Sequence, residues 1–119
     1  MRYMLLIYES EANMQKMTEE EGNRVMGEYM AFTDDIRRSG QYVAGAPLQP
    51  TPAATTVRVT NGKTLTTDGP FAETREQLGG YYLVEAKDLN EAISLAARIP
   101  AARTGSIEIR PIMEIPAQV

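Results

Sequence analysis

The sequence predicts a small α+β protein, and three observations lead to that class. Two segments are apolar on both faces of a strand, two others show helical periodicity behind N-terminal capping residues, and Asn61-Gly62 separates two β-branched segments. The 119 residues are 43% apolar and 24% charged, which is typical of a soluble chain with one core. We therefore expect residues 1–119 to form one domain, with a ferredoxin-like β-α-β-β-α-β order and an inserted β-hairpin.

The first expected strand runs from Arg2 to Tyr8, and its apolar residues alternate over both faces. They are Tyr3, Leu5 and Ile7 on one face, and Met4, Leu6 and Tyr8 on the other. A strand that is apolar on both sides is typical of the centre of a covered sheet. The polar residues from Glu9 to Met17 are expected to form a connection.

A first helix is expected to begin after Thr18, which forms a capping box with Glu21. It should end near Ser39, because Gly40 tolerates the left-handed conformation that follows a last helical turn. Met26 and Met30 are expected to fill the core beside the rest of its stripe. The apolar stripe of this helix comprises Val25, Met26, Tyr29, Phe32 and Ile36.

In the middle of the chain, three prolines and one turn signal indicate where strands and loops lie. Gln41–Ala44 is expected to be a short strand, and Gly45–Ala54, with three prolines, an extended loop. Asn61-Gly62 is a strong turn signal, so Thr55–Thr60 and Lys63–Thr67 should pair as a peripheral, half-exposed hairpin.

The last part of the chain supplies a strand, a helix and a strand. Gly80–Glu85 is apolar on both faces, and Asp88 with Glu91 caps a helix that Pro100 ends. Ser106–Ile115 should be the last strand. The expected stripe of the helix is Leu89, Ala92, Ile93 and Ala96, and the last strand places Ile107 and Ile109 opposite Glu108 and Arg110.

The expected sheet has more apolar surface than its helices can cover. Two helices cover one face of four strands, yet Arg2–Tyr8 and Gly80–Glu85 are apolar on both faces. An exposed patch of that size is rare on a monomer. The simplest cover is a second copy, so we expect a homodimer joined through the open sheet face.

Composition excludes several classes of function. A net charge of −4 disfavours nucleic acid as a partner, and no segment is long and apolar enough for a membrane span. The first residues lack the features of a signal peptide, which favours a cytoplasmic location. Without Cys or His there are no thiolate nucleophiles, Cys-based zinc sites or imidazole ligands, and a hard cation held by oxygens would lack the spacing of a calcium loop. We expect no metal and no cofactor.

The segment from Asp68 to Gly80 contains the main candidate site. A carboxylate precedes the Gly69-Pro70 turn, and a Gly-Gly pair opens the following strand. Asp68 is interpreted either as a pocket carboxylate that acts as a base or ligand anchor, or as a turn residue that accepts backbone N–H groups. Phe71 is expected to be a core residue or, alternatively, a ring that stacks on a ligand.

Three further residues are candidate ligand contacts. Tyr81 and Tyr82 point to opposite faces of one strand, so one should pack beneath the helices and the other face the dimer interior. Arg110 is a candidate for binding an anionic ligand if its face turns inward. The alternative for Arg110 is a surface ion pair with Glu108 or Glu85.

The segment Asp68–Gly80, followed by Tyr81-Tyr82-Leu83, resembles the signature of the DGPF branch of the YCII-related proteins. The likeness extends along most of the chain, through Arg2-Tyr3-Met4-Leu5-Leu6, Val57-Arg58-Val59, Ile99-Pro100-Ala101-Ala102-Arg103 and Ile109-Arg110-Pro111. This resemblance implies a single YCII-related (DGPF) domain that dimerises as an α+β barrel. Genes of this branch often lie beside those for extracytoplasmic-function sigma factors, which implies a regulatory setting.

Two functional hypotheses follow. Better understood YCII-like proteins resemble small cofactor-independent enzymes with a His–Asp pair, and Asp68 matches that aspartate, whereas the histidine has no counterpart here. The chain is accordingly either a binder of a small molecule in a dimer pocket near Asp68, or a cofactor-independent lyase or isomerase with Asp68 as general base. The absence of His favours the binder.

Overall fold

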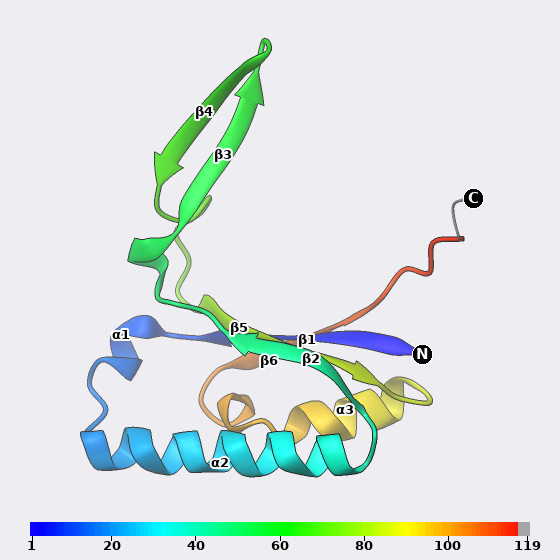
Figure 1. The fold of residues 1–119 in the computed structure, drawn as a ribbon. Helices are drawn as coiled ribbons and strands as arrows, with labels where there is room; N and C mark the ends of the chain where they lie inside the picture. The colour runs from blue at the N-terminus through cyan, green and yellow to red at the C-terminus, as the bar shows by residue number, and fades with distance from the viewer. Residues whose placement is uncertain (117–119) are drawn as a thin grey trace.

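The computed structural model describes residues 1–116 and places four strands in one antiparallel sheet of order β2-β5-β1-β6. Helices α2 and α3 lie on one face of that sheet (Figure 1). The mixed α+β class predicted from the sequence is confirmed. The sheet and its helices are β1 (Arg2–Glu9), β2 (Tyr42–Pro47), β5 (Gln77–Glu85), β6 (Ser106–Pro111), α2 (Glu19–Arg38) and α3 (Leu89–Ala97). The remaining elements are α1 (Glu11–Met14), η1 (Thr51–Ala53), η2 (Pro100–Ala102), β3 (Thr55–Thr60) and β4 (Lys63–Asp68).

Both long helices begin at the residues that the sequence predicts. Thr18 Oγ1 accepts a hydrogen bond from the Glu21 backbone N–H at 3.1 Å, and its hydroxyl donates to the Glu21 carboxylate at 3.0 Å. Asp88 accepts from the Glu91 backbone N–H at 2.9 Å. These contacts satisfy N–H groups that the first helical turn leaves free. Gly40 has a φ of +77° and ends the segment after α2, as expected.

The core lies between the helices and one face of the sheet. Tyr82 is central to it: its ring meets Phe32 edge to face at 5.2 Å, and its hydroxyl lies 2.7 Å from Thr33 Oγ1. Gly45 lies opposite Tyr82, where a Cβ would come within 2.9 Å of the ring. The buried residues are Tyr3, Leu5, Ile7, Phe32, Ile36, Tyr82, Val84, Ala86, Ala92, Leu95, Ala96, Ile99 and Ala101.

Four residues expected in the core lie outside it in the single chain. Met26 is 61% exposed and Met30 is similarly exposed, because both lie on the side of α2 away from the sheet. Leu89 and Ile93 of α3 are also largely exposed, and that helix instead buries Ala92, Leu95 and Ala96. Because α3 is apolar around most of its circumference, its periodicity does not fix which side faces the sheet.

Several boundaries differ from the sequence prediction. The connection after β1 contains the one-turn helix α1, where Ser10 Oγ accepts from the Asn13 backbone N–H at 3.2 Å. Strand β6 ends at Pro111 rather than Ile115. Pro111 has no N–H to donate, and beyond it the Ile112 N–H still donates to the Arg2 carbonyl at 2.9 Å.

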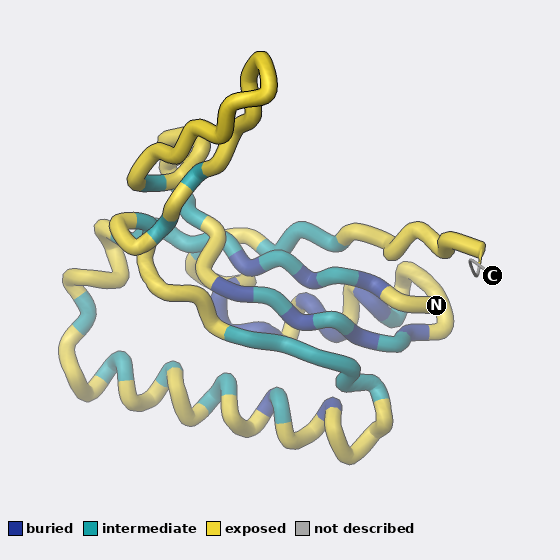
Figure 2. The backbone as a smooth tube through the Cα atoms, turned by 45° about the horizontal axis from the view of Figure 1, so that its top comes forward, coloured by how far each residue is buried: buried dark blue, intermediate teal, exposed yellow. Residues whose placement is uncertain are grey.

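Strands β3 and β4 form a separate peripheral hairpin, as predicted, but in the single chain it is exposed rather than half-exposed. The Asn61-Gly62 turn has positive φ at both residues (51° and 77°), and Val57 pairs with Thr66. The hairpin rises from the sheet on the side opposite the helices (Figure 1) and is exposed along nearly all of its length (Figure 2). The Cα radius of gyration is consequently 16.6 Å, against about 13.5 Å for a typical globular domain of this length.

Candidate functional site

The sheet face away from the helices carries side chains from all four strands, and we call it the open face. Directly opposed residues of paired strands point to the same side, so Leu6 lies between Tyr81 and Glu108, and Met4 lies between Leu83 and Arg110. Its apolar centre is only half-buried. The open face comprises Met4, Leu6, Tyr8, Ala44, Ala46, Tyr81, Leu83, Glu108 and Arg110.

Charged groups lie along the β6 edge of the open face. Arg110 Nε donates to Glu108 Oε2 at 2.8 Å, which lowers the pKa of Glu108 and raises the pKa of Arg110. Partial burial raises the pKa of the neighbouring Tyr8 phenol, and the charge of Glu108 adds to that shift. Arg110 therefore has an acidic partner in the single chain, which was one of its two sequence interpretations.

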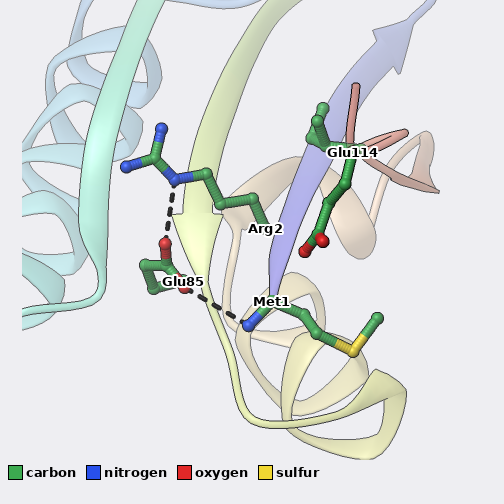
Figure 3. A pocket seen from close by; sticks show the side chains of 5 residues that line it. Met1, Arg2, Glu85 and Glu114 are labelled. Carbon is green, nitrogen blue, oxygen red and sulfur yellow. Dashed lines mark hydrogen bonds and ion pairs between the residues drawn. The ribbon is translucent and has the colours of Figure 1, made fainter. Parts of the chain in front are cut away.

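A small cavity of about 300 Å³ lies at the amino end of β1 (Figure 3). Arg2 Nε donates to Glu85 at 2.8 Å, the Met1 ammonium lies 3.4 Å from the same carboxylate, and Glu114 points toward the cavity. The hydrogen bond from Arg2 is the main reason that the pKa of Glu85 is lowered. These groups are exposed ion pairs that mostly satisfy one another, so each contributes little free energy.

A second cavity, of about 390 Å³, lies where the segment after β4 passes η1, and we call it the loop cavity. It is open to solvent, and its walls combine proline rings with hydroxyl, amide and carboxylate groups. The lining residues are Thr51, Pro52, Gly69, Pro70, Ala72, Glu73, Thr74 and Gln77.

A hydrogen-bond network around Glu11 holds the loop cavity together. The Glu11 carboxylate accepts from the Thr51 backbone N–H at 2.8 Å and from the Thr51 hydroxyl at 2.6 Å. The Glu11 backbone N–H donates to Gln77 Oε1 at 2.8 Å, and Gln77 Nε2 donates to the Thr74 carbonyl at 2.5 Å. Three segments distant in sequence are thus joined. Glu11 is not among the candidates predicted from the sequence, because Glu9–Met17 is expected only to be a polar connection.

Asp68 is the last residue of β4 and precedes Gly69, a lining residue of the loop cavity. Asp68 is exposed and pairs with Thr55 across the hairpin. Within residues 1–116, its side chain has no hydrogen-bond partner, so the expected acceptance of turn N–H groups is not observed. The turn is instead held by the Gly69 N–H, which donates to the Ala54 carbonyl at 2.7 Å, and by Thr56 Oγ1, which donates to the Gly69 carbonyl at 2.8 Å.

The other candidate residues fall in three different places. Tyr82 is buried in the core and Tyr81 lies on the open face, so the two tyrosines separate as expected. Arg110 shares the open face with Tyr81. Phe71 is 81% exposed in the single chain, so the expectation of a core residue is wrong: it lies in the segment after the hairpin, which does not reach the core. The five candidates therefore do not converge on one pocket within a subunit.

Over the described part of the chain, no three acidic side chains are arranged to hold a metal ion. Nor does any helix within residues 1–116 have the length and apolarity needed to cross a membrane.

The fold and its surfaces define a small two-layer α+β protein with an uncovered sheet face, a projecting hairpin and a polar cavity at the hairpin's base. Comparison with known families matches residues 1–116 to the YCII-related domain. The chain is also 40% identical, over 114 residues, to the uncharacterized protein R00369 of Rhizobium meliloti (strain 1021), covering 94% of this chain and 92% of that protein. This chain belongs to the YCII-related family.

Proposed function

We propose that this protein is a homodimeric, cytoplasmic small-molecule binder of the DGPF branch, with its ligand site in the loop cavity beside Asp68. The strand order β2-β5-β1-β6 supports a ferredoxin-like body with an inserted hairpin. Two such bodies that meet through their open faces make a dimeric α+β barrel.

The exposed surface of the single chain supports the dimer. A monomer of 13.2 kDa exposes about 6,400 Å² by the general scaling of surface with mass, whereas this chain exposes 8817 Å². The excess of about 2,400 Å² is at the upper end of what one subunit buries in a permanent dimer. The half-buried residues at the centre of the open face supply the apolar interior of such an interface.

The loop cavity carries the proposal of ligand binding. Its walls are fixed by Glu11, which joins η1 to Gln77, and a fixed wall reduces the ordering cost of binding. Glu73 lines the cavity and Asp68 directly precedes the lining residue Gly69, and neither carboxylate has a hydrogen-bond partner within residues 1–116. These groups can orient a small polar molecule.

Binding is favoured over catalysis by the surroundings of Asp68. A carboxylate becomes an effective base near neutral pH when burial makes its charged form unfavourable, and Asp68 is exposed. A binder also fits the regulatory setting beside sigma factors that the family resemblance implies. The alternative, a cofactor-independent lyase or isomerase with Asp68 as general base, requires the partner subunit to bury Asp68.

The test is to purify the protein from cells and examine it by native mass spectrometry, and then to screen a metabolite mixture by thermal melting. We expect a retained or added small molecule to raise the melting temperature of the wild type, and this rise to be lost in Asp68→Asn. Asp34→Asn, which changes an exposed carboxylate of α2 in the same way, should respond like the wild type.

A ligand-induced rise that survives Asp68→Asn unchanged would show that the site lies elsewhere. Chemical conversion of the bound molecule by the wild type, but not by Asp68→Asn, would establish the enzyme instead of the binder.

A further inference from the structure

We infer that the β3–β4 hairpin is an arm that packs against a second copy of this chain through the side chains of Val57, Val59, Thr64 and Thr66. This inference rests on the proposed dimer and adds a second contact surface to the open face. The surface is identified by the chemistry of the hairpin, its position and its charge.

The two faces of the arm differ in chemistry. The register pairs Val57 with Thr66 and Val59 with Thr64, so four β-branched side chains lie together on one face, with the Thr55–Asp68 pair beside them at the base of the arm. Such residues pack well on a pleated surface. The other face carries Leu65 together with Arg58 and Lys63, whose long charged side chains suit solvent or the rim of an interface. Both cationic side chains of the arm lie on the other face, so we take the face with Val57, Val59, Thr64 and Thr66 as the packing face.

Within residues 1–116 the packing face is left largely exposed. Val57 is 59% exposed and Val59 is 68% exposed. A two-stranded hairpin is at best marginally stable in water without a third strand or another layer against it. The Asn61-Gly62 turn fixes the register but buries no apolar area. A partner surface supplies the burial that the hairpin lacks.

The arm projects on the side where the proposed partner docks. It rises from the sheet opposite the helices (Figure 1). Each of its strands has 6 residues, which gives a length of about 20 Å. Packed sheets lie about 10 Å apart, so the arm is long enough to pass the sheet of a second copy seated on the open face.

Charge favours a second copy as the occupant. Within the arm, Arg58 and Lys63 outweigh Asp68, so residues 55–68 carry one net positive charge. The total charge is −4, so the rest of the chain carries a net charge of −5. A basic arm packed against the acidic body of another copy is electrostatically complementary. In a monomer the projecting arm does not make this contact.

The base of the arm is fixed to the body. The Gly69 N–H donates to the Ala54 carbonyl at 2.7 Å, and Thr56 Oγ1 donates to the Gly69 carbonyl at 2.8 Å. Gly69 also lines the loop cavity. Docking of the arm therefore orders the hairpin beside the ligand site of its own subunit.

The chain contains no Trp, so a single introduced Trp reports on the arm without background. We would compare Val59→Trp, on the packing face, with Thr60→Trp, on the opposite face, by emission and acrylamide quenching, with light scattering on the same samples. In the dimer we expect Val59→Trp to emit at shorter wavelength and to resist quenching, while Thr60→Trp is quenched freely. Dilution to the monomer should remove this difference.

A second variant removes the arm. Because Ala54 and Gly69 are hydrogen-bonded neighbours, residues 55–68 can be replaced by two glycines without separating the ends. We expect this variant to keep its circular dichroism spectrum and to raise the dimer dissociation constant by at least about tenfold.

Three results would overturn the inference. Free quenching of Val59→Trp in a dimeric sample would show that the arm is unpacked and would leave the dimer intact. Protection of Val59→Trp in a monomeric sample would show that the arm folds on its own subunit. A wild type that is monomeric at every concentration would refute the dimer and the arm together.

Discussion

Substitution of Leu6 by Asp tests the open face most directly. Leu6 lies at the centre of that face, between Tyr81 of β5 and Glu108 of β6. The neighbouring Leu5 and Ile7 point into the core and are unaffected. The substitution therefore separates assembly from folding.

The magnitude follows from what the interface would bury. Each subunit loses about 2 kcal/mol of leucine burial and gains a carboxylate whose desolvation costs at least about 1 kcal/mol. Glu108 is of like charge, so it adds to this cost. Because the substitution occurs in both subunits of a two-fold interface, the loss of dimerisation free energy is about 6 kcal/mol. This corresponds to an increase of about 10⁴-fold in the dimer dissociation constant. The monomer should lose less than about 1 kcal/mol of stability through strand propensity.

Sedimentation equilibrium over a wide concentration range measures this change, and circular dichroism melts report on the fold. Met26→Asp is the matched control, because it introduces the same charge on the exposed side of α2. We expect a folded monomer from Leu6→Asp and an unchanged dimer from Met26→Asp. An unchanged dissociation constant for Leu6→Asp would refute the assignment of the open face as the interface.

Three further predictions concern stability. Gly105→Ala should destabilise the fold by at least about 2 kcal/mol in denaturant melts, because its Cβ would lie 2.1 Å from the Tyr8 carbonyl oxygen. Gly27→Ala, in the exposed middle of α2 with nothing within 4 Å, should stabilise it by about 1 kcal/mol in the same assay. Burial raises the pKa of Tyr29 from 10.0 to about 12. Its neutral form therefore contributes stability that is complete below pH 10 and is lost as the pH rises through about 12, a loss of about 1–2 kcal/mol after allowance for partial exposure. Tyr29→Phe should flatten this pH dependence in melts at stepped pH, and an equal slope in both proteins would contradict it.

The local elements of the fold could be predicted because short-range chemistry determines them. Thr18 and Asp88 cap their helices through backbone groups three residues away. The Asn61-Gly62 turn likewise fixes the register of its own hairpin. Such contacts can be predicted from a few residues that are close together in the sequence.

Features that depend on distant segments could not be read in this way. The rotation of α3, which exposes Leu89 and Ile93, is decided by the sheet beneath it. The loop cavity depends on hydrogen bonds of Glu11 with Thr51 and Gln77. No local sequence pattern predicts contacts between residues so far apart in the chain. The exposure of Phe71 could not be predicted for the same reason. It depends on where the hairpin leaves the sheet and helices of the subunit.

The two-faced nature of β1 has a consequence for how this chain tolerates change over evolution. Odd-numbered positions from Tyr3 to Ile7 point into the core, and even-numbered positions from Met4 to Tyr8 point to the open face. In a saturation library, adjacent positions should therefore fail in different assays. Substitutions at odd positions would limit cellular abundance, whereas substitutions at even positions would limit formation of the proposed homodimer in a two-hybrid selection. A lineage that changed its mode of assembly could then substitute the even-numbered residues of β1 and retain the odd-numbered ones.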